Sequence, residues 1–175
     1  IRICLVGSEM CIRDRCEGYA VVGIDMATDE VAWTLAEEDG TLDLTEGDFP
    51  SCQHGLDVDG QRLLLYDNGA SPTTRAVEYA IDAAAGTATE TWSWTEDGWR
   101  EFAWGDVDYY GDRVIIGRGH LDAWGDGEGP TQVMEVERDT GTVAWRLLFD
   151  DEADAVYSAD PVSYTHLRAH ETDTD

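Results

Sequence analysis

Four histidines are the side chains best suited to chemistry near neutral pH, because imidazole is a nucleophile and a base while it is uncharged. They are His54, His120, His166 and His170. His54 follows Gln53 at the start of an alternating segment, and His120 follows the apolar run 114–116. A lone histidine more often has a structural role, so position alone leaves both His54 and His120 open as catalytic candidates.

A second group that could do chemistry is the acidic loop at residues 122–130. Asp122, Asp126 and Glu128 lie close together in it. Calcium prefers several carboxylate and carbonyl oxygens, but this spacing fits no EF-hand loop. We therefore expect a solvated acidic loop here, with no bound metal and no cofactor.

The two ends of the chain are related in a way that folding does not explain. Residues 5–14 read LVGSEMCIRD, and residues 162–171 read VSYTHLRAHE. The DNA sequence CTCGTGGGCTCGGAGATGTGTATAAGAGAC encodes the first, and its reverse complement encodes the second. Opposite strands of one DNA element explain both, and that element resembles a transposase-type sequencing adapter. We therefore expect residues 1–15 and 162–175 to be adapter-derived, and residues 16–161 to be a fragment of a longer protein.

The adapter assignment removes two histidines and two cysteines from consideration: His166, His170, Cys4 and Cys11. Residues 1–15 and 162–175 should then pack poorly and should not continue the strand pattern of the rest. Cys52 is the one cysteine well inside the fragment, so cysteine usage leaves the redox compartment open.

The composition is strongly acidic. The chain has 38 Asp and Glu against 11 arginines and no lysine, which gives a formal net charge of −27. The two ends hold four arginines and five acidic residues, so residues 16–161 carry −26. Such a charge disfavours binding to nucleic acid or anionic membranes, and no apolar run is long enough to span a bilayer. Seven Trp, seven Tyr and three Phe argue for a folded core rather than disorder.

One pattern occurs three times between residues 20 and 150. Each copy predicts a strand, a tight turn rich in Asp, Thr or Gly, and a second strand that ends in tryptophan. The copies are Val22–Trp33, Val77–Trp92 and Met134–Trp145. Asp25, Asp82 and Glu137 align, at spacings of 57 and 55 residues.

Two hairpins of another type lie between these copies, at Leu56–Tyr66 and Val107–Ile116. Each period therefore holds four short strands, which is the signature of a β-propeller blade. We predict an all-β fold, a partial β-propeller of about two and a half four-stranded blades. A β-sandwich is the alternative, but it would not explain the regular alternation of two hairpin types.

The ordered motifs of this region resemble the bacterial aryl-sulfate sulfotransferase (arylsulfotransferase) family. The matching segments are Ser51–His54, Leu63–Gly69, Thr74–Asp82, Gly105–Val107, Val114–Gly117 and Thr140–Trp145. In that family a Gln-His pair precedes an apolar strand that ends in Asp-Asn-Gly. A Ser-Arg pair follows, which here is Thr74-Arg75. The resemblance covers most of residues 20–150 and implies a six-bladed propeller that is periplasmic or secreted.

The resemblance also implies a reaction. The family moves a sulfuryl group from an aryl sulfate to a phenol through a sulfohistidine, and His54 matches its nucleophile. His120 falls near a strand end that lines the family's site. Arg75 and Arg118 are the nearest cations for the sulfuryl oxygens, and Asn68 in the Asp-Asn-Gly turn is a further candidate for substrate binding. The family's other anion-binding residues lie upstream, so the fragment alone should be inactive.

A binding propeller is the alternative function. The repeat Asp-x-x-Thr-Gly-x-Val-x-Trp also resembles quinoprotein and outer-membrane-assembly propellers, in which tryptophan packs between blades. Those repeats need no Gln-His pair before Asp-Asn-Gly, so the segment around His54 favours the sulfotransferase. Tyr66 and Trp104 could each stack on a phenol ring or pack between blades, and packing is the commoner role. The oligomeric state and the acceptor stay open.

Overall fold

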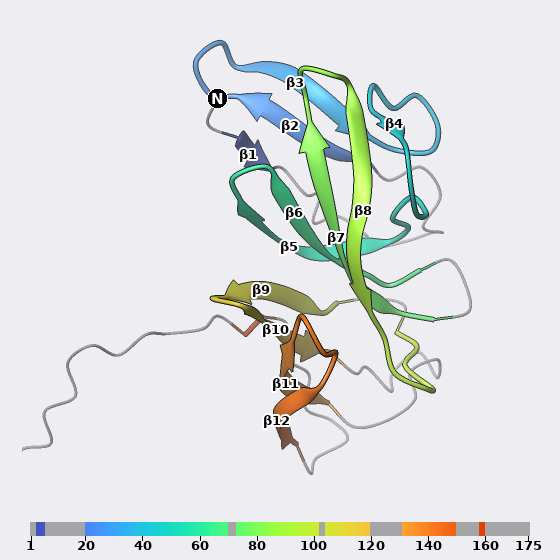
Figure 1. The fold of residues 1–175 in the computed structure, drawn as a ribbon, viewed down its shortest axis with the longest axis vertical. Helices are drawn as coiled ribbons and strands as arrows, with labels where there is room; N and C mark the ends of the chain where they lie inside the picture. The colour runs from blue at the N-terminus through green and yellow to red at the C-terminus, as the bar shows by residue number, and fades with distance from the viewer. Residues whose placement is uncertain are drawn as a thin grey trace, which may run out of the picture.

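The structure, a computed structural model, describes residues 3–5, 20–69, 73–101, 104–119, 131–149 and 158–159. Within these ranges the chain forms twelve β-strands and no helix (Figure 1). The predicted all-β class is therefore confirmed. It follows that the described residues contain no helix of the length and apolarity needed to cross a membrane.

The strands are arranged in three sheets. The first contains β1 (Ile3–Leu5), β2 (Val21–Asp25) and β3 (Glu30–Leu35). The second contains β4 (Asp43–Leu44), β5 (Gln53–Asp59), β6 (Arg62–Asp67), β7 (Arg75–Asp82) and β8 (Thr87–Trp94). The third contains β9 (Asp106–Tyr110), β10 (Arg113–Arg118), β11 (Gln132–Glu137) and β12 (Val143–Leu148). β5–β8 and β9–β12 are each a four-stranded antiparallel meander.

The three copies of the repeat share one strand register. In each hairpin the tryptophan pairs with a residue of the preceding strand: Trp33 with Gly23, Trp92 with Glu78 and Trp145 with Glu135. The register shifts directly after that residue in all three hairpins. Such a bulge bends and twists the strand pair, so the three hairpins share the same distortion. The expected equivalence of the tryptophans is confirmed.

Both faces of the second sheet are buried. Leu63 and Leu65 of β6 belong to a core shared with β2 and β3, whereas Leu64 and Tyr66 belong to a core shared with β10 and β11. Successive residues of a strand point to opposite faces, and all four of these side chains are buried. The three sheets therefore stack face to face (Figure 1), which is one layer more than a two-sheet sandwich has.

The tryptophans of β8 dock the second sheet onto the third. The indole Nε1 atoms of Trp92 and Trp94 donate to the carbonyl oxygens of Arg138 at 3.0 Å and Gly141 at 2.9 Å, in the turn between β11 and β12. Trp145, at the equivalent place in the third sheet, is 44% exposed, and the described residues place no further sheet over it.

β4 departs from the predicted pattern of antiparallel hairpins, because it pairs in parallel with β8. The main-chain N–H groups of Asp43 and Thr45 donate to the carbonyl oxygens of Gly86 and Ala88, each at 2.9 Å. Leu42, directly before β4, is buried in the first core and anchors the segment. The chain leaving the first sheet thus covers the edge of β8, which would otherwise expose unpaired main-chain groups.

The pairing of β1 with β2 contradicts the expectation that residues 1–15 do not continue the strand pattern. Residues 3–5 pair antiparallel with residues 23–25 of β2. An edge strand offers unpaired N–H and C=O groups to any extended segment, so this pairing needs no matching side chains. The adapter origin of residues 1–15 stays a prediction, and residues 162–175 lie outside the described part of the chain.

Replacing Leu64 by alanine should lower the free energy of unfolding by about 2–5 kcal/mol, because it opens a cavity between the second and third sheets. Leu147→Ala is the matched control, since that side chain is 52% exposed and its loss should change stability by about 0.5 kcal/mol or less. Urea unfolding followed by tryptophan fluorescence measures both. Equal losses for the two variants would contradict the stacked arrangement.

Candidate functional site

His54 lies in β5 opposite Tyr66 of β6, and it is half-buried. Directly after it the register shifts at Gly55, whose φ is +29°. A Cβ at Gly55 would lie 2.3 Å from Asp106 Oδ1 and 2.5 Å from Asp106 Cα. Glycine therefore lets β5 approach β9 closely at this point, and the bulge re-aims the side chain of the residue before it.

Two oxygen atoms contact the Nδ1 atom of the His54 ring. Oδ1 of Asn68 is 2.6 Å away, and the carbonyl oxygen of Cys52 is 3.1 Å away. A carbonyl oxygen can only accept, so Nδ1 carries the hydrogen. The neutral ring then has its free lone pair on Nε2. Nε2 is therefore the atom that can attack an electrophile or take up a proton.

Cys52 anchors the start of β5. It is buried, it is disulfide-bonded, and its φ of +56° places it in the left-handed region. That conformation is uncommon for a residue other than glycine, and the disulfide restrains the chain there. The carbonyl group that accepts from His54 thus belongs to a buried residue with an uncommon backbone conformation.

Asp67, which is buried, forms an ion pair with the half-buried Arg75 at the facing ends of β6 and β7. Arg75 Nε donates to Asp67 Oδ2 at 2.9 Å. Asp67 Oδ1 accepts from the main-chain N–H groups of Ser51 at 2.9 Å and Gly69 at 3.1 Å. Burial raises the pKa of Asp67, although these donors oppose the rise. Arg75 also binds Glu90 Oε2 at 3.0 Å, so two carboxylates neutralise this guanidinium group.

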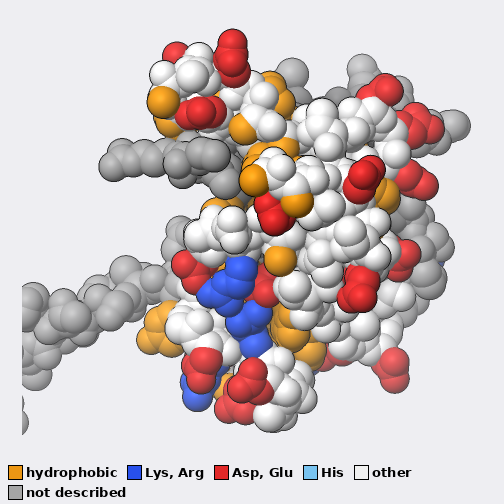
Figure 2. Space-filling view, turned by 45° about the horizontal axis from the view of Figure 1, so that its top comes forward, with side chains coloured by type: hydrophobic (Ala, Val, Ile, Leu, Met, Phe, Trp, Pro, Cys, Tyr) orange, Lys and Arg blue, Asp and Glu red, His pale blue; other side chains and the backbone are white. Residues whose placement is uncertain are grey.

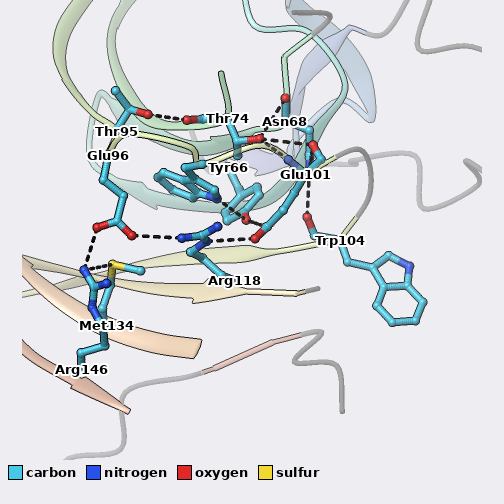
Figure 3. A network of polar contacts seen from close by, with 11 residues as sticks. Tyr66, Asn68, Thr74, Thr95, Glu96, Glu101, Trp104, Arg118, Met134 and Arg146 are labelled. Atoms are coloured by element: carbon cyan, nitrogen blue, oxygen red, sulfur yellow. Dashed lines mark hydrogen bonds and ion pairs between the residues drawn. The ribbon is translucent and has the colours of Figure 1, made fainter. Parts of the chain in front are cut away.

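Arg118, at the end of β10, is likewise paired with two carboxylates (Figure 3). Its Nε donates to Glu101 Oε1 at 2.9 Å, and its Nη1 donates to Glu96 Oε1 at 3.0 Å. The hydroxyl group of Tyr66 donates to Glu101 Oε2. Burial raises the pKa of Glu101, and burial together with the Glu101 charge raises the pKa of Tyr66 well above its ordinary value. Tyr66 packs edge-on against Trp99, so it belongs to the core rather than to a phenol-stacking surface.

Most of the arginine charge in the described part of the chain is paired with nearby carboxylates. Acidic side chains are spread over the face drawn in Figure 2, and the arginines gather in one area of it. Six arginines have ion-pair partners: Arg62, Arg75, Arg113, Arg118, Arg138 and Arg146. An anionic ligand that approached any of them would also meet a carboxylate.

The structure brings two predicted site residues into direct contact and connects two others to them. His54 contacts Asn68. Arg75 binds the residue that precedes Asn68. Arg118 binds Glu101, whose main-chain oxygen accepts from Asn68 Nδ2 at 3.1 Å. Arg75 and Arg118 are thus connected to His54 through Asn68 and its neighbours.

The main-chain oxygen of Trp104 belongs to this group, because it accepts from Asn68 Nδ2 at 3.0 Å. The indole of Trp104 points away from the network in Figure 3. His120 and the acidic loop with Asp122, Asp126 and Glu128 lie outside the described residues. Within the ranges that the structure describes, no three His, Cys, Asp or Glu side chains are placed to hold a metal ion.

Glu101 and Thr74 are two residues of the site whose roles the sequence did not predict. Thr74 is fully buried, and its hydroxyl accepts from the main-chain N–H of Glu101 at 2.8 Å. One feature of the sequence pointed to Thr74, namely its place in the Thr-Arg pair. No feature of the sequence pointed to Glu101, because this residue lies in the connection between β8 and β9, which shows no strand pattern.

The raised pKa of Glu101 predicts a pH dependence of stability. A carboxyl group whose pKa is higher in the folded state contributes stability that is fully present below its unfolded pKa of about 4.3 and is lost as pH rises through the folded pKa. Glu101→Gln cannot ionise. The free energy of unfolding of this variant should therefore increase relative to that of the wild type between pH 4 and pH 7. The increase should be about 1.4 kcal/mol per unit of difference between the folded and unfolded pKa of Glu101.

Urea unfolding at several pH values measures this difference. Glu37→Gln, at an exposed position, is the control and should track the wild type. A difference that moves the opposite way would show that Arg118 and Tyr66 lower the pKa of Glu101 more than burial raises it.

Comparison with known protein families gives one match. Residues 17–158 match the family described as Arylsulfotransferase (ASST). No curated protein matches the chain. The family match covers well over half of the 175 residues and includes β2–β12, with His54 and its partners. The chain therefore belongs to the arylsulfotransferase family.

Proposed function

We propose that this protein transfers a sulfuryl group from an aryl sulfate to a phenol, with Nε2 of His54 as the nucleophile. The family supports a transferase of this general kind. The observation that carries the proposal is the state of the His54 ring, whose Nδ1 donates to oxygen and whose Nε2 therefore has the lone pair. An imidazole in this state can attack sulfur without first losing a proton.

The reaction has two balanced steps. In the first, the Nε2 lone pair forms a bond to sulfur, the bond between sulfur and the aryl oxygen breaks, and the aryl group leaves as a phenolate. In the second, the oxygen of an acceptor phenol attacks the same sulfur, the N–S bond breaks, and the phenolic proton is released. Neither step needs a metal or a redox partner, and a covalent intermediate splits one difficult transfer into two easier ones.

The negative charge of the sulfuryl oxygens and of the departing phenolate needs positioned donors. Arg75 and Arg118 are each bound to two carboxylates, so they offer little uncompensated charge. We propose that residues 16–161 are about two and a half blades of a six-bladed propeller, and that other blades supply donors for the anion. His120 remains a candidate contact. The fragment alone is then inactive.

The same proposal places the protein in the periplasm or outside the cell. Members of this family set that expectation.

The test is mass spectrometry of the longer parent protein after brief exposure to a chromogenic aryl sulfate without acceptor. We expect one SO₃ group on the peptide that contains His54, and its loss when a phenol is added. His54→Asn should abolish both the adduct and turnover. Asp59→Asn, at the exposed end of the same strand, is the control and should keep both.

An adduct on another residue, or full turnover by His54→Asn, would contradict the proposal. A parent protein that forms no adduct and shows no turnover would instead favour a propeller that binds ligands without chemistry.

A further inference from the structure

We propose that Asn68 is a positioning residue, which holds His54 in the Nδ1–H tautomer, and that it does not contact the substrate as the sequence suggested. The inference rests on the proposed function of His54, and it names the group that keeps Nε2 available. Asn68 lies directly after β6, and its side chain is almost fully buried, with 2% of the residue exposed.

The orientation of the Asn68 amide follows from its partners. Nδ2 donates to the main-chain carbonyl oxygens of Glu101 at 3.1 Å and Trp104 at 3.0 Å. Carbonyl oxygens accept only, so the NH₂ end of the amide must face them. Oδ1 must then face His54, where it lies 2.6 Å from Nδ1. Both donor hydrogens and the acceptor of this side chain are engaged within the protein, which leaves no free donor for a sulfuryl oxygen.

The two carbonyl groups are themselves held in place. The hydroxyl of Thr74 accepts from the N–H of Glu101 at 2.8 Å and lies 3.1 Å from the carbonyl oxygen of Asn68 and 3.2 Å from that of Glu101. The Glu101 side chain is bound to Arg118 of β10 (Figure 3). The end of β6, the start of β7 and the connection to β9 thus fix Asn68 together.

The hydrogen bond to Asn68 stabilises the His54 ring both before and after sulfuryl transfer. In the resting enzyme the other tautomer would turn its Nδ1 lone pair toward two oxygen atoms, Asn68 Oδ1 and Cys52 O, so it is disfavoured. After transfer to Nε2 the ring becomes cationic, and the hydrogen bond from Nδ1–H to Asn68 becomes charge-assisted and stronger. Asn68 therefore supports the nucleophile before the transfer and the sulfohistidine after it.

The test is ¹⁵N NMR of the 175-residue chain with labelled histidine, in which two-bond couplings from the ring hydrogens identify the protonated nitrogen. The His54 signals are assigned by their absence in His54→Asn. For the wild type at a pH where the ring is neutral, we expect Nδ1–H alone. Asn68→Ala should give a mixture that includes Nε2–H. Asn68→Asp keeps an acceptor at this place and should keep Nδ1–H.

Asp67→Asn is the matched control. It changes the neighbouring buried residue and its bonds to Ser51 and Arg75, but it leaves the His54 partners intact, so Nδ1–H should persist. In the parent protein, Asn68→Ala should slow the sulfation of His54 by about 10–100-fold, the loss seen when a hydrogen bond that orients a metal-binding imidazole is removed.

The outcomes separate this inference from the proposed function. Nε2–H in the wild type, or unchanged Nδ1–H in Asn68→Ala, would overturn the role of Asn68 whatever the protein does. If Asn68→Ala does not fold, Nε2–H in the wild type would still overturn the inference. A tautomer that responds to Asn68→Ala, in a parent protein that never sulfates His54, would confirm the positioning and refute the sulfotransferase.

Discussion

Burial of both faces of the second sheet is the constraint on which the rest of the structure depends. Leu63 and Leu65 pack toward the first sheet, while Leu64 and Tyr66 pack toward the third. β6 is therefore sealed between two cores, and burial of each large apolar side chain contributes about 1.5–3 kcal/mol. Because β6 is fixed in this way, Asn68 at its end lies at a defined position beside His54.

The site is built where this central strand meets its neighbours. Tyr66 donates to Glu101, Glu101 binds Arg118, and the main chain of Glu101 accepts from Asn68. Buried polar groups are costly unless they are paired, and here each group has partners within the protein. The strongly acidic chain thus uses its arginines to balance carboxylates, and the nucleophile that we propose is an uncharged imidazole.

Much of the fold was predictable because its signals are local. The Asp, Thr and Gly turns and the terminal tryptophans predicted three equivalent hairpins, and the strand registers of Trp33, Trp92 and Trp145 agree. The parallel strand β4 and the pairing of β1 were not predicted, because they depend on which sheet edges are left open.

The site was less predictable, since its bonds join residues far apart in sequence. His54 and Asn68 were selected by motif, but the roles of Asn68 and Glu101 follow from contacts across 33 residues, which no periodicity reveals. The sequence also suggested Arg75 and Arg118 as the nearest cations for the sulfuryl oxygens, whereas the structure pairs each with two carboxylates.

We propose that Nε2 of His54 takes the sulfuryl group while Nδ1–H stays bound to Asn68. The most direct measurement is the ¹⁵N spectrum of the histidine-labelled parent protein, trapped with an aryl sulfate in the absence of acceptor. We expect the His54 Nε2 resonance to change to that of a substituted nitrogen, while Nδ1 keeps its directly bonded hydrogen. Sulfur bound to Nδ1, or an unchanged His54 ring in a protein that turns over, would contradict it.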